Sequence, residues 1–196
     1  MKRLLKAALL AGAAMGVAAA TARGRGRELD DRLYKRVNTD LQQPALDAAF
    51  SGVTELGSMW ASVGAAAALA ASGRPRVARG AVGAAGAMWI LGQALKRRYG
   101  RARPFDSSAP GRLLIGKPAG TSWPSSHPAV LMAFVTVAAR ELRLSRAARR
   151  ALIGLAGAVA ASRVYLGVHY PSDVAGGLLL GRALGDAWPD ASPASG

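Results

Sequence analysis

The sequence contains no cysteine and only two histidines among its 196 residues. The lack of cysteine excludes disulfides and thiolate metal sites, and it leaves the redox compartment open. Two histidines without a cluster of carboxylates at ligand spacing also argue against a catalytic metal. We therefore expect no metal and no other cofactor, and any imidazole chemistry must come from His127 or His169.

Aromatic and acidic residues are also few. Phe, Trp and Tyr make up 6% of the chain. The chain has 11 acidic residues and 26 lysines and arginines, which gives a formal net charge of +15. A strongly basic chain can bind nucleic acid. Here, however, the cations cluster between long uncharged stretches, without the interleaved aromatic residues that stack on bases. Nucleic-acid binding is therefore not expected.

Long uncharged runs are the main positive feature, since 51% of the residues are hydrophobic. The runs Leu56–Gly73 and Gly80–Leu95 are 18 and 16 residues long. Eighteen helical residues cover about 27 Å, close to the roughly 30 Å hydrocarbon core of a bilayer. Both runs are rich in Gly and Ala, which let membrane helices approach closely. The alternative is a buried helix pair in a soluble protein. Such a pair would need other, less apolar elements to cover it, and the sequence offers none.

The fold class predicted from these runs is an all-α integral membrane bundle of about six transmembrane helices. A polar segment after the first run has Leu29, Leu33, Val37 and Leu41 at four-residue spacing, which predicts a helix lying in the membrane interface. The six bundle helices are expected around 1–22, Leu56–Gly73, Gly80–Leu95, Ala129–Ala139, Ala151–Ser162 and Val174–Trp188.

The domain organisation is simple. Residues 1–22 form a first transmembrane helix or a cleaved signal peptide, because Ala18–Ala22 offers small residues for cleavage. We favour the retained helix. Residues 23–190 form one membrane-embedded domain and 191–196 a short tail, and the oligomeric state stays open.

The segment Ser162–Asp173 places His169 six residues after Arg163 and four before Asp173. Pro171 suits the first position of a helix, so Asp173 falls in the first helical turn and can reach back to the imidazole. An imidazole held by a carboxylate, beside a cation and a helix N-terminus, is typical of a nucleophile facing a phosphate site.

Two further clusters extend this pattern. Lys96 lies seven residues before Arg103, which precedes Pro104, and Pro124-Ser125-Ser126-His127 precedes another apolar run. In this order the three motifs resemble those of the type 2 phosphatidic acid phosphatase family, which also occur in bacterial acid phosphatases and vanadium haloperoxidases. The resemblance covers roughly Asp47 to Trp188.

The resemblance implies roles for eight residues. His169 matches the nucleophile that forms a phosphohistidine, His127 matches the general acid, and Asp173 is expected to hold the nucleophile. Residues expected to bind phosphate are Lys96, Arg103, Ser125, Ser126 and Arg163. Ser126 stands where the family usually has glycine. Arg97, Arg98 and Arg101 match no motif position and are expected to form a basic surface at lipid headgroups.

The implied function is a metal-independent membrane phosphatase. Its substrate would be a phosphomonoester or diphosphate of a lipid, such as phosphatidic acid, phosphatidylglycerol phosphate or a polyprenyl diphosphate. Three alternatives stay open: a polyprenyl-phosphosugar phosphatase of cell-wall synthesis, a secreted soluble acid phosphatase, and a non-catalytic membrane scaffold with a degenerate site. The protein is expected in the cell membrane, crossing it several times.

Charge distribution predicts the orientation. The end of the bundle away from the motifs would hold five arginines within 140–150. Excess cations mark the cytoplasmic side of membrane proteins. The active site is therefore expected on the outer face, although the cations of 23–36 lie on the same side as the motifs.

Overall fold

The computed structural model describes residues 1–107 and 111–190, and within these ranges it contains eight α-helices and no strand. The helices are α1 (Lys2–Ala20), α2 (Gly24–Lys35), α3 (Pro44–Glu55), α4 (Met59–Ala71), α5 (Pro75–Tyr99), α6 (Ser126–Glu141), α7 (Arg146–Tyr165) and α8 (Pro171–Ala187). A π-helical turn, Arg36–Asp40, extends α2, and a short 3₁₀ turn spans Pro104–Asp106. The predicted tail at 191–196 lies outside the described residues.

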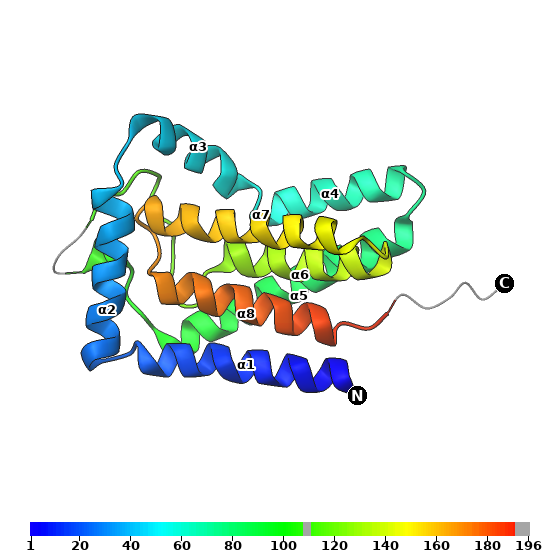
Figure 1. Ribbon diagram of the computed structural model, residues 1–196, viewed down its shortest axis with the longest axis horizontal. Coiled ribbons are helices and arrows are strands. Elements are labelled where there is room, and N and C mark those ends of the chain that lie inside the picture. The colour runs from blue at the N-terminus through cyan, green and yellow to red at the C-terminus, as the bar shows by residue number, and fades with distance from the viewer. Residues whose placement is uncertain (108–110, 191–196) are drawn as a thin grey trace.

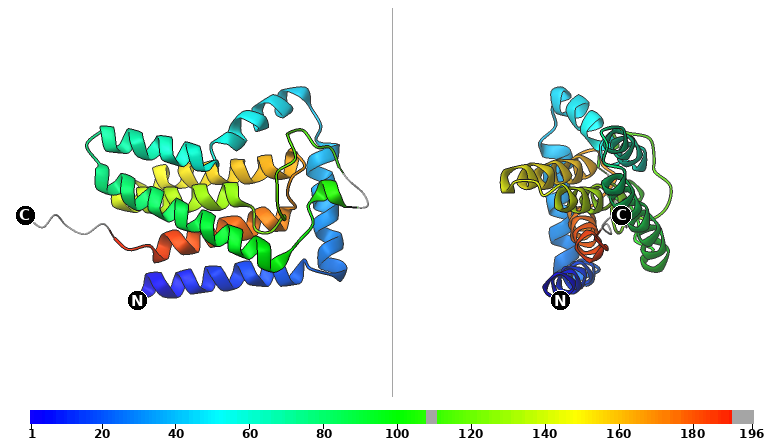
Figure 2. Two further views of the ribbon diagram at one scale, coloured as in Figure 1. Left: turned by 180° about the vertical axis from the view of Figure 1, so that it is seen from behind. Right: turned by 90° about the vertical axis from the view of Figure 1, so that its right-hand side faces the viewer.

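The long helices lie side by side around α6 (Figures 1 and 2). Every residue of α6 from Pro128 to Ala139 is buried, as expected for a helix that is apolar on all sides. The neighbouring α8 carries Gly177, Gly181 and Gly185 at four-residue spacing, and a Cβ at any of them would collide with α6 or the residue before it. This row of glycines lets the two helices touch along their backbones.

The helix α2 crosses one end of the bundle, at the connection between α7 and α8 (Figure 1). The predicted amphipathic helix is present, but it is followed at Pro44 by a separate helix, α3, which was not expected. Proline is favoured in the first turn of a helix because its missing N–H has no partner there. The run Leu56–Gly73 is also shorter as a helix than predicted, since Leu56 to Ser58 form the turn between α3 and α4.

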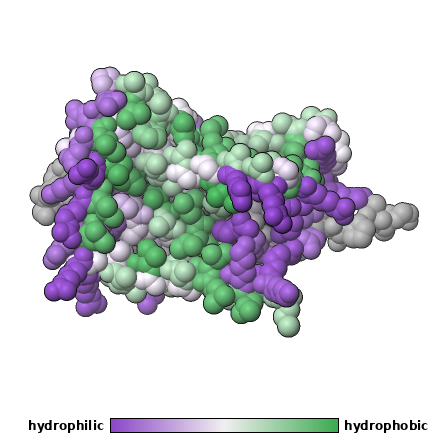
Figure 3. All heavy atoms as spheres, in the orientation of Figure 1, coloured by the Kyte–Doolittle hydropathy of each residue, from purple (hydrophilic) through white to green (hydrophobic). Residues whose placement is uncertain are grey.

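The opposite end of the bundle is basic and holds the N-terminus. Arg3 pairs with Asp190, and Lys6 pairs with Asp186. The arginine-rich stretch 140–150 was expected to be a loop, but α6 continues to Glu141 and α7 begins at Arg146. In Figure 3 hydrophobic side chains cover the middle of one face, between hydrophilic side chains along α2 and at the end near the termini.

Only α1, among the described helices, combines the length and the apolar composition typical of a membrane-crossing helix, and α4 is a shorter apolar helix. The other long helices do not combine the two properties. Charged residues lie at both ends of α5 and α7, and α6 and α8 are only 16 and 17 residues long. The all-helical bundle is confirmed, whereas the count of about six spans stays a prediction.

Candidate active site

The turn between α7 and α8 places His169. Gly167 has φ +86°, and a Cβ there would collide with the carbonyl oxygen of Arg112. A positive φ is accessible to glycine without steric cost, so the chain can reverse sharply after α7. Pro171 then starts α8, and the Tyr170 N–H donates to Asp173 Oδ2 at 2.8 Å. The carboxylate of Asp173 is thereby turned back toward the loop that carries His169.

His169 is buried with its two ring nitrogens in different surroundings. Nδ1 lies 3.5 Å from Asp173 Oδ2 and 3.4 Å from Ser122 Oγ, and Ser122 Oγ donates to the same Asp173 oxygen. Nε2 lies 3.3 Å from Arg103 Nη1. A carboxylate beside Nδ1 favours the tautomer with its proton on Nδ1, which leaves the lone pair on Nε2, toward the cations.

The surroundings of His169 favour its neutral ring. Burial lowers the pKa of His169 well below its usual value, and the neighbouring positive charges of Lys96 and Arg103 lower the pKa further. A neutral imidazole keeps the lone pair that a nucleophile requires.

Three cations from three segments converge near this ring. Lys96 Nζ donates to the carbonyl oxygen of Thr121 at 2.7 Å, and Arg103 donates to those of Gly120 and Val168 at 2.8 and 3.0 Å. Arg163 Nη1 donates to Thr54 Oγ1 at 2.8 Å, while Arg163 Nε has no hydrogen-bond partner among the described residues. Each of the three residues is at most 7% exposed.

In the described part of the chain, no carboxylate lies at ion-pair distance from any of these three cations. They are held by carbonyl and hydroxyl oxygens instead. Buried charges are costly unless paired, so a cluster of this kind is expected to receive an anion.

The start of α6 contributes hydroxyls and the second histidine. Ser125 is fully buried, and its N–H donates to the Asp173 carbonyl at 3.0 Å. Within residues 1–107 and 111–190, its Oγ has no hydrogen-bond partner. His127 is half-buried and packs against the turn at Gly57, where a Cβ would lie 2.8 Å from His127 Cβ. The first N–H groups of a helix have no partner within the helix, so the start of α6 can also bind an anion.

Ser126, the departure from the family pattern, is the first residue of α6. Its Oγ has no hydrogen-bond partner in the part of the chain that the structure describes, and a Cβ at Gly92 of α5 would lie 3.6 Å from it. The extra side chain therefore occupies space beside a glycine of the neighbouring helix. All eight residues singled out in the sequence thus lie at the same end of the bundle.

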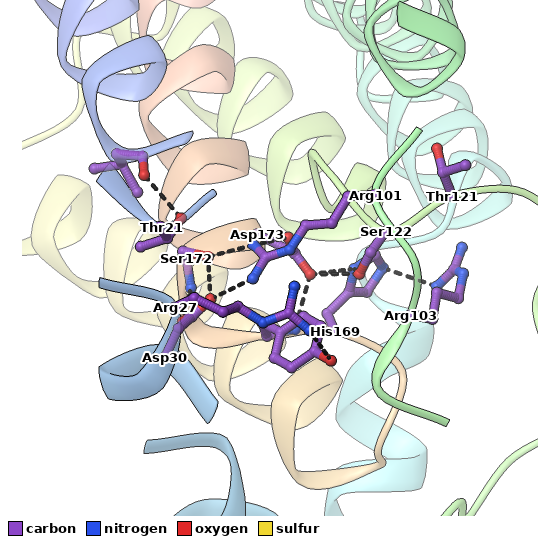
Figure 4. Close-up of polar contacts among 12 residues, drawn as sticks. Thr21, Arg27, Asp30, Arg101, Arg103, Thr121, Ser122, His169, Ser172 and Asp173 are labelled. Atoms are coloured by element: carbon purple, nitrogen blue, oxygen red, sulfur yellow. Dashed lines mark hydrogen bonds and ion pairs between the residues drawn. The ribbon is translucent and has the colours of Figure 1, made fainter. Parts of the chain in front are cut away.

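The structure adds residues that the sequence motifs did not single out. Arg101 was expected on a basic surface, but this expectation was wrong. Its Nη1 lies 2.8 Å from Asp173 Oδ1, and its Nη2 lies 2.6 Å from Asp30 Oδ2. Figure 4 shows Arg101 between Asp30 and Asp173, with Ser122 and His169 on the other side of Asp173. Arg97 and Arg98 are exposed, as predicted.

The side chains around His169 do not resemble a metal site. Within residues 1–107 and 111–190, no three histidine, aspartate or glutamate side chains converge as ligands. Apart from Asp173 at Nδ1, the groups that surround the ring are lysine, arginine and serine, which suit an oxyanion.

Comparison with known proteins supports the resemblance seen in the motifs. A model of the PAP2 superfamily matches residues 78–192. An undecaprenyl-diphosphatase from Sulfolobus acidocaldarius is 38% identical over 94 residues, which cover 47% of this chain and 44% of that relative. The chain therefore matches less than half the length of this curated relative.

Two solved structures share the fold. The transmembrane PAP2 type phosphatidylglycerolphosphate phosphatase from Bacillus subtilis has a TM-score of 0.78 at 24% identity, covering 91% of this chain and 92% of that chain. Aquifex aeolicus LpxE has a TM-score of 0.71 at 25% identity, covering 79% and 90%. Because the family model spans more than half of the sequence and includes all three motifs, the chain belongs to the PAP2 superfamily.

Proposed function

We propose that this protein is a membrane phosphatase that hydrolyses a phosphomonoester or diphosphate of a lipid through a phosphohistidine on His169. The observation that carries the proposal is the cluster of Lys96, Arg103 and Arg163, buried around a buried imidazole without a carboxylate partner at ion-pair distance. A phosphate group is the anion that such a cluster suits, because arginine can grip two of its oxygens at once.

The proposed reaction has two steps. Nε2 of His169 attacks phosphorus, so that an N–P bond forms while the bond from phosphorus to the lipid oxygen breaks. His127, protonated while the phosphate is bound, gives its proton to that leaving oxygen. Water then attacks the phosphohistidine and passes a proton back to His127, and the N–P bond breaks to release inorganic phosphate. The three cations oppose the charge on the equatorial oxygens in both transition states.

Asp173 supports the nucleophile in this scheme. It accepts from the Tyr170 N–H and from Ser122, which fixes its carboxylate beside Nδ1 of His169. As the imidazole becomes positively charged on attack, the carboxylate stabilises it. Ser125 adds an unpaired hydroxyl at the start of α6.

The substrate class follows from the relatives. Undecaprenyl diphosphate and phosphatidylglycerol phosphate are named for two of them, and both are phosphate esters at the end of an apolar lipid. A membrane location agrees with these relatives and with the exposed apolar residues along the bundle, among them Trp60, Trp89, Ile90 and Ile153. We propose that the bundle crosses the membrane several times.

The direct test is release of phosphate from a panel of lipids in detergent: phosphatidic acid, phosphatidylglycerol phosphate and a polyprenyl diphosphate. We expect turnover of at least one of them to persist in excess EDTA, because protein cations already neutralise the phosphate. Vanadate, which adopts a trigonal bipyramid, is expected to inhibit. Absence of turnover on the whole panel would contradict the proposed function, and loss in EDTA that Mg²⁺ restores would contradict its mechanism.

We also propose that the site faces outward. The cations at the end opposite His169 include Arg3, Lys6, Arg74, Arg76, Arg79, Arg140, Arg143, Arg146, Arg149 and Arg150. Cations beside short connections between helices are typical of the cytoplasmic side. The six cations of 23–36 lie at the other end, with the site.

Single cysteines test this orientation in a chain that has none. Arg146→Cys and Lys117→Cys each replace one exposed cation, at opposite ends of the bundle. In intact cells, an impermeant thiol reagent is expected to label the variant at 117 and to spare the variant at 146. Both are expected to react once the cells are opened. The reverse pattern in intact cells would place the site in the cytoplasm.

A further inference from the structure

The helix α2 turns a polar face toward the active site. Asp30, Tyr34 and Asn38 follow one another at four-residue spacing and are 3%, 2% and 0% exposed. Leu29 and Leu33, on the other side, are 50% and 47% exposed. An amphipathic helix usually buries its apolar face against the protein. Here the buried face is polar, so the contacts of its polar side chains must hold α2 against the bundle.

Each buried residue of this face contacts the chain around His169. Tyr34 packs edge to face against Tyr170, with ring centroids 5.5 Å apart. The Asn38 amide donates to the carbonyl oxygen of Tyr165 at 2.7 Å and to that of Arg112 at 2.9 Å. The helix therefore binds the chain on both sides of the turn that presents His169.

Asp30 makes the contacts nearest to the catalytic carboxylate. Its Oδ1 accepts the backbone N–H of Ser172 at 2.9 Å, and its Oδ2 accepts from the Ser172 hydroxyl and from Arg101. Asp30 thus caps the first turn of α8 from another helix. A carboxylate at the N-terminus of a helix is favourable because it meets unpaired N–H groups there.

Arg101 joins this carboxylate to Asp173. Nη2 donates to Asp30 Oδ2 at 2.6 Å, and Nη1 donates to Asp173 Oδ1 at 2.8 Å and to the Ser172 hydroxyl at 2.6 Å. Asp173 is 0% exposed. Its other oxygen, Oδ2, faces Nδ1 of His169, so the guanidinium fixes the rotation of the carboxylate from the side away from the imidazole.

We propose that Asp30 and Arg101 are positioning residues for the nucleophile, acting in series: Asp30 orients Arg101, and Arg101 keeps the Asp173 carboxylate aimed at His169. This inference rests on the proposed function. Neither residue would touch the substrate phosphate. Lys96, Arg103 and Arg163 bind other partners, so a defect in the series should affect the chemical step more than phosphate binding.

The test compares Asp30→Asn with Asp31→Asn in the full-length protein. Asp31 is the next residue of α2, is partly exposed, and pairs with Arg27 on the surface, so the control removes the same charge. We expect kcat to fall about 10- to 100-fold in D30N, as is typical when a hydrogen-bonded partner behind a functional group is lost. The inhibition constant of inorganic phosphate should stay within about twofold. D31N should match the wild type in both.

Arg101→Lys and Arg101→Gln extend the test. A lysine cannot hold two carboxylates in a fixed fork, so R101K is expected to lose about as much kcat as D30N. In R101Q the fork is lost altogether, so kcat is expected to fall at least as far as in R101K, while the inhibition constant of inorganic phosphate stays within about twofold. A merely structural role would lower the amount of folded protein without changing kcat per folded enzyme.

A double-mutant comparison decides whether the two residues act in series. If they do, adding D30N to R101Q should change kcat far less than D30N changes it alone. An equal loss in both backgrounds, or a D30N enzyme with wild-type kcat, would overturn the inference. These outcomes are distinct from failure of the proposed function, in which the wild type and D31N would release no phosphate at all.

Discussion

Replacing His169 with alanine is expected to abolish turnover of every phosphate substrate, whatever its leaving group. The imidazole supplies the attacking lone pair on Nε2, which faces Arg103, whereas the neighbouring Ser122 hydroxyl lies on the Nδ1 side of the ring and donates to Asp173. Covalent catalysis requires that group in both steps. The measurement is phosphate release from a lipid substrate and from p-nitrophenyl phosphate, compared with the wild type.

The control for this variant is the integrity of the phosphate site. Arg103 keeps its bonds to the carbonyl oxygens of Gly120 and Val168 when the ring is removed, so H169A should stay folded and still bind inorganic phosphate. Near-normal turnover by folded H169A, on either substrate, would overturn the mechanism.

Replacing His127 with alanine is expected to give a loss that depends on the leaving group. A lipid alkoxide is a poor leaving group, and general acid catalysis typically contributes about 10²–10⁴-fold. Nitrophenolate departs without a proton. H127A should therefore lose two to four orders of magnitude, roughly, on phosphatidic acid and far less on p-nitrophenyl phosphate. The ratio of the two kcat/KM values, against that of the wild type, is the quantity to measure.

Equal losses on the two substrates would contradict the acid role of His127. The residue would then act as a packing group at the start of α6, where it contacts the turn at Gly57. Because His127 is also the base for the second step, H127A is further expected to accumulate the phosphohistidine when the activated substrate is used.

The sequence predicted which candidate residues lie close together where the relevant spacing is local. His169 and Asp173 are four residues apart across a helix start, and Pro171 marks that start, so their approach follows from helix geometry. The uncharged runs likewise predicted the apolar helices, and Gly177, Gly181 and Gly185 fit the close packing of α6 and α8.

What the sequence could not predict depends on contacts between distant segments. Asp30 and Arg101 are 71 residues apart, and Arg163 and Thr54 are 109 apart. No periodicity shows that a polar helix face will be buried against a helix start, because hydrophobic patterning indicates only which face is apolar. Arg101 was assigned to the surface for this reason. One feature of the sequence could have indicated a role for Arg101 at the site: it lies between the two motif cations Lys96 and Arg103, directly after Gly100.

The break of the chain into α3 and α4 was missed for a related reason. Pro44 comes shortly after the predicted amphipathic helix, and it begins the next helix, α3. Leu56 to Ser58 read as part of an uncharged run, although Gly57 packs against His127 and Val159 and interrupts the helix. Thr54, at the end of α3, could then reach Arg163.

The most direct test of the account is to find the phosphorylated residue. H127A would be mixed with a radiolabelled activated phosphate ester, quenched in alkali, digested and mapped by mass spectrometry. The account predicts a base-stable, acid-labile phosphoryl group on His169, absent from the double variant H127A/H169A. Phosphate on a serine such as Ser122 or Ser125, or turnover by the wild type with no phosphoryl-enzyme under any quench, would contradict it.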